Sequence, residues 1–430
     1  MKQINNTLFA LNKNDTYQQW KVFVNGDSVI VEFGREGGKL QTKITTCTPK
    51  NVGRANETTA EQQALLEAKS KWEKQVRLGY REDKSSLTNT PVISPMLAAD
   101  ATKKSHMIKY PCYISQKLDG LRVLVTFDED GEPVFNSRGN KTYPIQGKLI
   151  EQMKELRRLS GFDVFDGELY IHGLPLQKIT SLAKKWKSKE DIDKEINKEY
   201  MKEYSKWKSS PKKYSPPEPD TLKYGGYCSD DLEYHIFDIP SELPFWAESG
   251  DSDGWDSPTT RESALTQVDH IIVDSEYVPN EYGEIPLTHL KVVLGNIAED
   301  EDSVKESIGS YMSQGYEGTI IRNFEGKYEY GQRSNDLLKW KLFQDTEAEV
   351  VDVEEDKNGE GVLICRDREG VIVRLKMKGT HQDRIYKNQL KNVGKWVNFT
   401  FQTRTEDNNY QFPVGVGFRA VNKETKEVEE

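Results

Sequence analysis

The stretch that organises the chain is Ser115-Gln116-Lys117-Leu118-Asp119-Gly120-Leu121-Arg122. The apolar runs on both sides of it predict two strands, so Lys117 falls at a strand end or in the turn between them. On its own this turn motif is more typical of a solvated turn than of a site. Making a lysine neutral at pH 7 from a pKa of ~10.4 costs about 4.6 kcal/mol. A site that uses Lys117 covalently must lower that cost by desolvation or by nearby positive charge.

Length and composition limit the class of protein. The 430 residues are enough for about two to four domains. The formal net charge is −10, so a nucleic-acid partner would need a local basic surface. The four cysteines form no C-x-x-C pair, which argues against zinc and against a disulfide framework. The start of the chain lacks a signal-peptide core, and no apolar run approaches the ~20 residues of a bilayer span. We therefore expect a soluble, cytoplasmic protein that has no membrane partner.

Residues 1–84 are expected to form a small separate domain. Residues 20–24 and 29–33 alternate between apolar and polar side chains around Asn25-Gly26, a strong hairpin signal. An amphipathic helix is predicted at about residues 59–78. The order of strands, turn and closing helix gives a β-plus-helix module.

The turn Phe33-Gly34-Arg35 in this module resembles the WGR domain, a small DNA-binding module, with phenylalanine in place of the tryptophan. The 14 Lys/Arg against 10 Asp/Glu of residues 1–84 leave a local charge of +4, which favours phosphate contact. Arg35 and Lys39 are the candidate DNA contacts. A β-module that binds another protein is the alternative.

Further charged motifs follow downstream, and each has an ordinary interpretation by itself. Ser137-Arg138-Gly139-Asn140 is a turn that carries an arginine. Apolar residues flank Asp166-Gly167-Glu168, so we expect Glu168 to project from a buried strand into a cleft.

Phe237 lies in a short buried strand, where it either belongs to the core or stacks on a purine. Glu317 stands at the mouth of a strand. Lys339 and Lys341 alternate with apolar residues, so on a strand both would point to one face and need an anion there.

These motifs, in this order over about 225 residues, resemble the motif series of the covalent nucleotidyltransferases, and most closely that of ATP-dependent DNA ligases. The resemblance covers about residues 95–430. One departure is the order Ser-Arg-Gly-Asn, where the family usually has Asn or Thr before Gly. The fold implied is a multidomain α+β protein. After a linker at residues 85–94, it has an adenylation (nucleotidyltransferase) domain of antiparallel sheets and helices at residues 95–345, and an OB-fold barrel at residues 346–430.

The resemblance also implies a chemistry. Neutral Lys117 would attack the α-phosphate of ATP, pass AMP to the 5′-phosphate of nicked duplex DNA, and let the 3′-hydroxyl seal the nick. Glu168 and Glu317 would hold Mg²⁺, for which Mn²⁺ could substitute. The residues expected to bind ATP or AMP are Gln116, Lys117, Leu118, Arg122, Arg138, Glu168, Phe237, Glu317, Arg333, Lys339 and Lys341. Several of these cations would supply positive charge to the phosphates and favour neutral Lys117.

An insertion at about residues 183–226 interrupts the adenylation domain. It is rich in lysine, glutamate and aromatic residues, and its first part, up to about residue 208, is predicted to be helical before a proline-rich segment breaks it. Lysine and aromatic interleaving suits contact with a nucleic-acid backbone. A solvated helical hairpin is an equally weighted alternative. The candidate DNA contacts here are Lys184, Lys185 and Lys187. The acidic residues 248–256 lack the spacing of a calcium loop and are interpreted as a solvated loop.

From about residue 348 the sequence predicts short strands. Four are expected at residues 350–353, 362–365, 371–375 and 396–401, and a helix at residues 381–390. Five strands with such a helix suggest an OB-fold. The last strand, residues 412–419, resembles the closing motif of the ligase OB domain, with Arg419 as its basic residue.

Three other functions compete with this interpretation. RNA ligases and capping guanylyltransferases use the same lysine chemistry. An NAD-dependent ligase is disfavoured, because the chain lacks the expected cysteine cluster for zinc. A non-catalytic protein that binds DNA ends would not need Lys117 or both glutamates. A compact ligase with a small added module would suit a virus or bacteriophage, in which case it would work in the host cytoplasm. We expect a monomer with little sequence preference on DNA.

Overall fold

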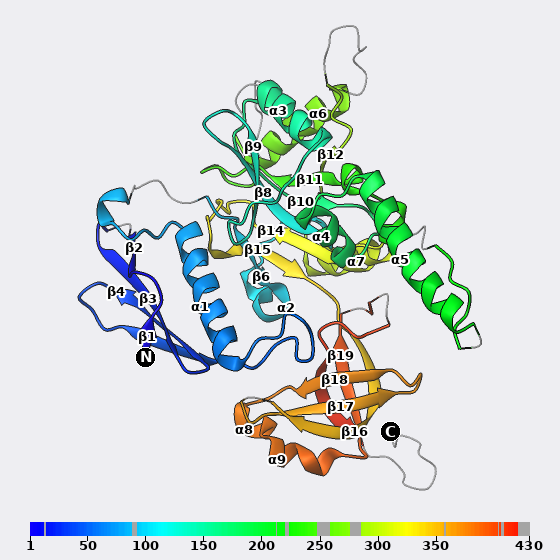
Figure 1. The fold of residues 1–430 in the computed structure, drawn as a ribbon. Coiled ribbons are helices and arrows are strands. Elements are labelled where there is room, and N and C mark those ends of the chain that lie inside the picture. The colour runs from blue at the N-terminus through cyan, green and yellow to red at the C-terminus, as the bar shows by residue number, and fades with distance from the viewer. Residues whose placement is uncertain are drawn as a thin grey trace. The chain divides into compact units, whose positions relative to one another are not determined.

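The computed structural model describes residues 1–12, 14–87, 93–211, 213–219, 223–246, 259–275, 285–356, 358–402, 404–405 and 408–419. The chain divides into two compact units, Met1–Trp340 and Lys341–Glu430 (Figure 1). The sequence predicted three domains, and the first two lie together in the first unit, except that residues 341–345 of the second belong to the second unit. The acidic residues 248–256 and part of the expected linker lie outside the described residues. Among the described helices, none has the length and apolar character needed to cross a membrane.

The chain begins with a small sheet and one helix. Its strands are β1 (Lys2–Gln3), β2 (Leu8–Leu11), β3 (Tyr17–Asn25), β4 (Ser28–Arg35) and β5 (Gln41–Thr46), in the order β1-β3-β4-β5 with β2 paired to β3. The predicted hairpin is confirmed: β3 ends at Asn25, and Gly26 turns the chain with φ +57°. Helix α1 (Ala60–Arg77) is also confirmed, and Thr59 caps it in a capping box with Gln62.

Two further five-stranded sheets form the body of the first unit. Their orders are β12-β11-β10-β8-β9 and β13-β7-β14-β15-β6. The strands are β6 (Leu97–Asp100), β7 (Cys112–Lys117), β8 (Leu121–Phe127), β9 (Pro133–Ser137), β10 (Phe165–Tyr170), β11 (Glu233–Asp238), β12 (Leu290–Val292), β13 (Asn296–Ala298), β14 (Gly318–Arg322) and β15 (Arg333–Trp340). Most pairs are antiparallel, as expected. The exceptions are β11 with β12 and β15 with β6, which are parallel.

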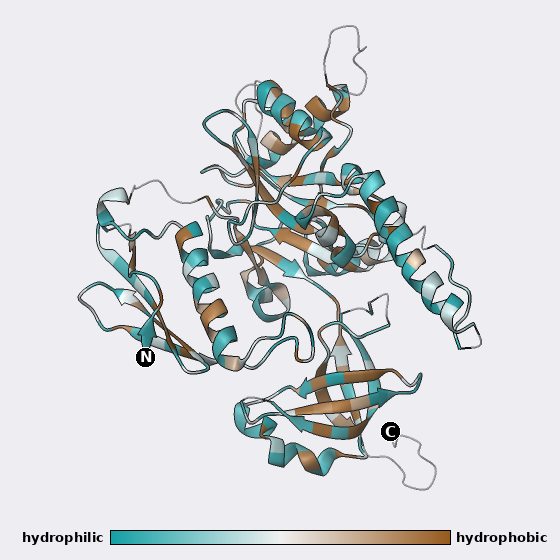
Figure 2. Ribbon diagram, viewed as in Figure 1, coloured by the Kyte–Doolittle hydropathy of each residue, from teal (hydrophilic) through white to brown (hydrophobic). Residues whose placement is uncertain are grey.

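Helices cover these sheets, whose strands carry many of the apolar residues shown brown in Figure 2. The main core packs β8, β10 and β11 against helices α3, α4 and α6. The helices are α2 (Ala101–Lys104), α3 (Lys148–Ser160), α4 (Leu176–Lys184), α5 (Lys189–Ser209), α6 (Arg261–Ser275) and α7 (Glu301–Ser313). Helix α5 confirms the helix predicted in the first part of the insertion.

The turn after Lys117 carries the chain from one sheet to the other, because β7 and β8 belong to different sheets. Gly120 lies in this turn. A Cβ atom at Gly120 would lie only 2.8 Å from Glu168 Oε2 and 2.8 Å from the Leu169 carbonyl oxygen. The glycine of the lysine motif is therefore needed for close approach of the turn to β10.

The second unit is a closed five-stranded barrel in the order β16-β17-β18-β20-β19. The strands are β16 (Gln344–Glu355), β17 (Gly361–Asp367), β18 (Ile372–Met377), β19 (Trp396–Phe401) and β20 (Val414–Arg419). All five predicted strands are present. The single helix predicted at residues 381–390 is wrong: α8 (His381–Arg384) and α9 (Tyr386–Gln389) are separated by Ile385, whose extended backbone bridges to Glu360.

Candidate active site

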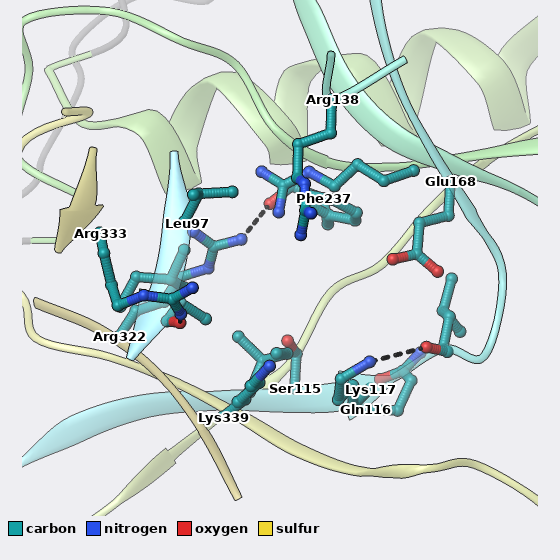
Figure 3. Close-up of a pocket in the computed structure, with 15 residues that line it drawn as sticks. Leu97, Ser115, Gln116, Lys117, Arg138, Glu168, Phe237, Arg322, Arg333 and Lys339 are labelled. Atoms are coloured by element: carbon teal, nitrogen blue, oxygen red, sulfur yellow. Dashed lines mark hydrogen bonds between the residues drawn. The ribbon is translucent and has the colours of Figure 1, made fainter. Parts of the chain in front are cut away.

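A pocket in the first unit is lined by both large sheets (Figure 3). In the figure Lys117 and Lys339 lie along one wall, and Arg138, Phe237 and Glu168 lie along the other. Nine of the eleven residues predicted to bind ATP or AMP line this pocket: Gln116, Lys117, Leu118, Arg122, Arg138, Glu168, Phe237, Arg333 and Lys339. The sequence reasoning missed six others, which are Leu97, Ala98, Ser115, Ile320, Arg322 and Leu337.

Lys117 is the last residue of β7, and its ammonium forms an ion pair with the Glu317 carboxylate. It also donates a hydrogen bond of 3.1 Å to the Leu118 carbonyl oxygen. Only 16% of the Lys117 side chain and 8% of the Glu317 side chain are exposed. Burial lowers the pKa of Lys117, and this outweighs Glu168 and Asp119, which raise it. The site therefore favours the neutral amine more than water does.

Glu168 projects from β10 into the pocket, as expected, and stands opposite Arg122 of β8. Its Oε2 accepts a hydrogen bond of 3.0 Å from the Gly120 backbone N–H. Burial raises the pKa of Glu168, although Lys117 and Arg122 oppose this. The lysine, the turn and this carboxylate are thus held together at one end of the pocket.

Arg122 lines the pocket, and its guanidinium is paired with a buried carboxylate. Its Nε donates to Asp166 Oδ1 at 2.9 Å, and its Nη2 pairs with the second carboxylate oxygen. Asp166 is fully buried and also accepts a hydrogen bond from the Tyr328 hydroxyl. Burial lowers the pKa of Arg122, but the Asp166 carboxylate raises it by more, so the guanidinium stays charged. The first acid of Asp166-Gly167-Glu168 therefore neutralises the arginine of the lysine motif.

Three other cations give the pocket its positive charge: Arg138, Arg333 and Lys339. Arg333 donates to the Ala98 carbonyl oxygen. Within the part of the chain that the structure describes, none of the three forms an ion pair. Burial lowers the pKa of Lys339, and the charges of Lys117 and Arg333 lower it further. This unbalanced positive charge suits an anionic ligand.

Phe237 faces the pocket, while its neighbours Ile236 and Asp238 are buried behind it. The sequence left open whether Phe237 belongs to the core or faces a ligand, and the structure places it at the pocket. The Arg122 guanidinium carbon lies 4.9 Å from the centre of the Phe237 ring. One ring face is therefore supported by protein, and the pocket offers a flat aromatic surface.

A buried ionic cluster lies behind Phe237. Arg322 Nη1 donates to Asp238 Oδ2 at 2.6 Å, and Arg261 Nε donates to Asp238 Oδ1 at 2.8 Å. Arg322 also donates to the Phe237 carbonyl oxygen at 3.0 Å. The sequence carried a signal for this cluster, because Asp238 and Arg322 each end an apolar strand and a buried charge needs a partner.

Several predicted residues lie outside this pocket. Strand β15 ends at Trp340, so the expectation that Lys339 and Lys341 share one strand face is wrong. Lys341 belongs to the second unit, where its Nζ donates to Gln402 Oε1 at 3.4 Å. Arg419 also lies in that unit, and its Nε is 2.9 Å from Glu347 Oε1.

The predicted DNA contacts differ in exposure. Arg35, Lys39, Lys184 and Lys185 are exposed. Lys187 is buried, and its ammonium contacts Glu195 and the Tyr224 hydroxyl. The Glu195 carboxylate therefore neutralises the Lys187 ammonium within the fold, which corrects the expectation that Lys187 contacts DNA.

Comparisons with known proteins agree with the motif resemblance. No family model matches the chain. The DNA ligase of African swine fever virus (isolate Warthog/Namibia/Wart80/1980) is 26% identical over 339 residues. This chain is similar to viral DNA ligases. The match covers 76% of this chain and 64% of the relative, so the chain spans less than two thirds of that relative's length.

Two solved structures share the fold. The structure named "Pmar-Lig_PreS3" has a TM-score of 0.53 and 17% identity, over 84% of this chain and 73% of that one. The structure named "Pmar-Lig_Pre." has a TM-score of 0.52 and 19% identity, over 77% of this chain and 68% of that one. The likeness to these two structures is one of fold.

Proposed function

We propose that this protein is an ATP-dependent DNA ligase that seals nicks in duplex DNA through a lysine–AMP intermediate on Lys117. The observation that carries the proposal is the placing of Lys117. It is a largely buried lysine with a lowered pKa, at one end of a pocket. That pocket also holds a ligand-facing aromatic ring and three cations that form no ion pair among the described residues. Similarity to viral DNA ligases supports the choice of substrate.

In the first step, the neutral Lys117 amine attacks the α-phosphorus of ATP in line with the leaving pyrophosphate. A P–N bond forms, and the bond from the α-phosphorus to the bridging oxygen breaks. Glu317 contacts the ammonium and is placed to take its proton. Arg138, Arg333 and Lys339 balance the charge on the phosphates, and Phe237 stacks on the adenine.

In the second step a 5′-phosphate oxygen of the nick bonds to the phosphorus of AMP as the P–N bond to Lys117 breaks. In the third, the 3′-hydroxyl oxygen bonds to the 5′-phosphorus, its proton passes to water, and AMP leaves. The Lys117 amine leaves with a proton when the P–N bond breaks. The same cations face the phosphate in each transfer, so one pocket serves the three steps.

A magnesium ion fits this site as a companion of the ATP phosphates. Two partly buried carboxylates, Glu168 and Glu317, lie near the Lys117 amine, and Mg²⁺ uses one or two carboxylates together with phosphate oxygens and water. In the described part of the chain no group of three or more His, Cys, Asp or Glu side chains could hold a metal by itself. Glu168 and Glu317 would hold the ion, which would supply charge neutralisation at the phosphates.

The other parts of the chain are assigned roles in the same proposal. Residues 1–84 form a WGR-like DNA-binding domain with Arg35 and Lys39 at its surface, and residues 95–345 form the adenylation domain. The closed barrel is an OB-fold, and its basic residue Arg419 is a proposed DNA contact. The support is the local charge of +4 in residues 1–84 and the five-stranded closure of the barrel.

The proposal is tested with the full chain, Mg²⁺ and a duplex that carries one nick with a 5′-phosphate. Sealing with ATP, and not with GTP or NAD⁺, is expected. Sealing only of RNA strands would identify an RNA ligase, and GTP use would identify a capping enzyme. Binding of nicked DNA with neither lysine adenylation nor sealing would identify a non-catalytic end-binding protein.

A further inference from the structure

Helix α5 (Lys189–Ser209) has two halves of opposite charge. Residues 189–197 contain four acidic residues and two lysines. Residues 198–211 contain four lysines and two glutamates, in a chain whose net charge is −10. We call residues 198–211, all of which the structure describes, the arm.

Only the first half of α5 is fixed in the core. Ser188 caps the helix, and Ile192 and Ile196 are its two buried residues. No residue of the arm is buried, and Figure 1 shows this end of α5 projecting from the body of the first unit. A helix that leaves the core must be stabilised by its own side chains.

An aromatic row supplies that stabilisation. The ring centres of Tyr200 and Tyr204 are 5.9 Å apart, and those of Tyr204 and Trp207 are 5.5 Å apart. The spacing of four and three residues places the three rings along one side of the helix. These rings pack on each other while no arm residue is buried, so the arm keeps its helical shape in solvent.

Lysines follow the arm at helical spacing. Lys198, Lys202 and Lys206 are four residues apart and so lie along one face, over about 12 Å of helix. All three are exposed, and Lys206 also pairs with Glu203 at 2.7 Å. A stiff row of exposed ammonium groups matches the regular phosphates of a duplex.

We propose that the arm contacts the phosphate backbone of duplex DNA outside the nucleotide pocket. This inference rests on the proposed ligase function, and it assigns the insertion a role in holding the duplex rather than in chemistry. Because the contact is with phosphates, it adds affinity without sequence preference.

The test compares two double variants that change the net charge equally. The arm variant is Lys198→Gln with Lys202→Gln, and the control is Lys189→Gln with Lys194→Gln on the first half of the same helix. Binding of a nicked duplex and of single-stranded DNA is measured from 50 to 200 mM salt. Lysine adenylation by ATP and nick sealing are measured for each protein. Circular dichroism verifies that α5 remains helical.

The arm variant is expected to bind nicked duplex more weakly, with a slope of log K against log salt that is shallower by about 1.8, which is two phosphate contacts. The control variant should match wild type, and all three proteins should form lysine–AMP equally. Equal losses in both variants, no loss in the arm variant, or a loss confined to single-stranded DNA would overturn the proposal. If wild type does not bind duplex DNA, both the ligase function and the proposed arm contact are overturned. If wild type is adenylated but does not seal nicks, only the ligase function is overturned.

Discussion

The Lys117 ammonium and the Glu317 carboxylate form an ion pair across 200 residues of sequence. The backbone supports this pair, because the Glu317 N–H donates to the Lys117 carbonyl oxygen at 2.8 Å and Gly318 is the strand partner of Lys117. The pairing of β7 with β14 therefore brings the proposed nucleophile to the group that can take its proton.

The first prediction concerns the pH dependence of adenylation. Burial lowers the pKa of Lys117 below the 10.5 of an unperturbed lysine, so the neutral amine is populated at lower pH. The rate of lysine–AMP formation with saturating ATP should rise with pH and level off before pH 10.5. Glu317→Gln removes a charge that favours the ammonium, so its rising limb should shift to lower pH. A wild-type rate that is still rising tenfold per pH unit near pH 10 would contradict this.

The local part of the site is predictable from the sequence. Lys117, Glu168 and Phe237 lie in short motifs whose flanking residues predict the strands that carry them, so their positions follow from local patterns. The pairing of Arg122 with Asp166 could not be predicted from local patterns, because it depends on the register of β8 against β10. Tyr328 reaches Asp166 from 162 residues away, and no local pattern encodes that contact.

Two errors in the sequence analysis have related causes. The alternation at Lys339 and Lys341 indicated one continuous strand, but β15 ends where its partner β14 begins, with Trp340 paired to Thr319. The helix expected at residues 381–390 has suitable residues throughout, yet the bridge from Ile385 to Glu360 extends the backbone in its middle. In both cases a tertiary pairing overrides the local preference.

A second prediction concerns Tyr328. Its hydroxyl donates to Asp166 and accepts a hydrogen bond of 3.1 Å from the Met96 N–H, just before the pocket residues Leu97 and Ala98. Tyr328→Phe keeps the ring but removes one hydrogen bond from the buried Asp166 carboxylate and leaves the Met96 N–H without this acceptor. We expect a loss of about 1–3 kcal/mol in the free energy of unfolding and a higher KM for ATP in adenylation.

The matched control for Tyr328 is Tyr330→Phe, since the two rings are neighbours with centres 4.9 Å apart. It should leave both the stability and the KM near wild type. Denaturant unfolding and adenylation kinetics measure the two effects. Equal behaviour of the two variants would show that the Tyr328 hydroxyl does not support the pocket.

A third prediction concerns the buried cluster behind Phe237. Asp238 is 1% exposed and pairs with both Arg261 and Arg322. Asp238→Ala would leave two guanidinium groups buried without their carboxylate, which should cost about 3–5 kcal/mol in the free energy of unfolding. Asp302→Ala removes an acid from an exposed helix pair and should cost less than about 1 kcal/mol. Urea unfolding of both variants checks the difference, and similar small losses would contradict a supporting role for the cluster.

The most direct test of the account is covalent labelling of the protein by ATP. Wild type, Lys117→Ala and the control Lys103→Ala, whose lysine side chain is 80% exposed, are incubated with Mg²⁺ and α-labelled ATP and separated on a denaturing gel. We predict label on wild type and on the control, none on Lys117→Ala, and loss of the label when nicked duplex is added and sealed. Label on Lys117→Ala at the wild-type level, or no label on folded wild type between about pH 6 and 9, would contradict the central claim that Lys117 is the nucleophile.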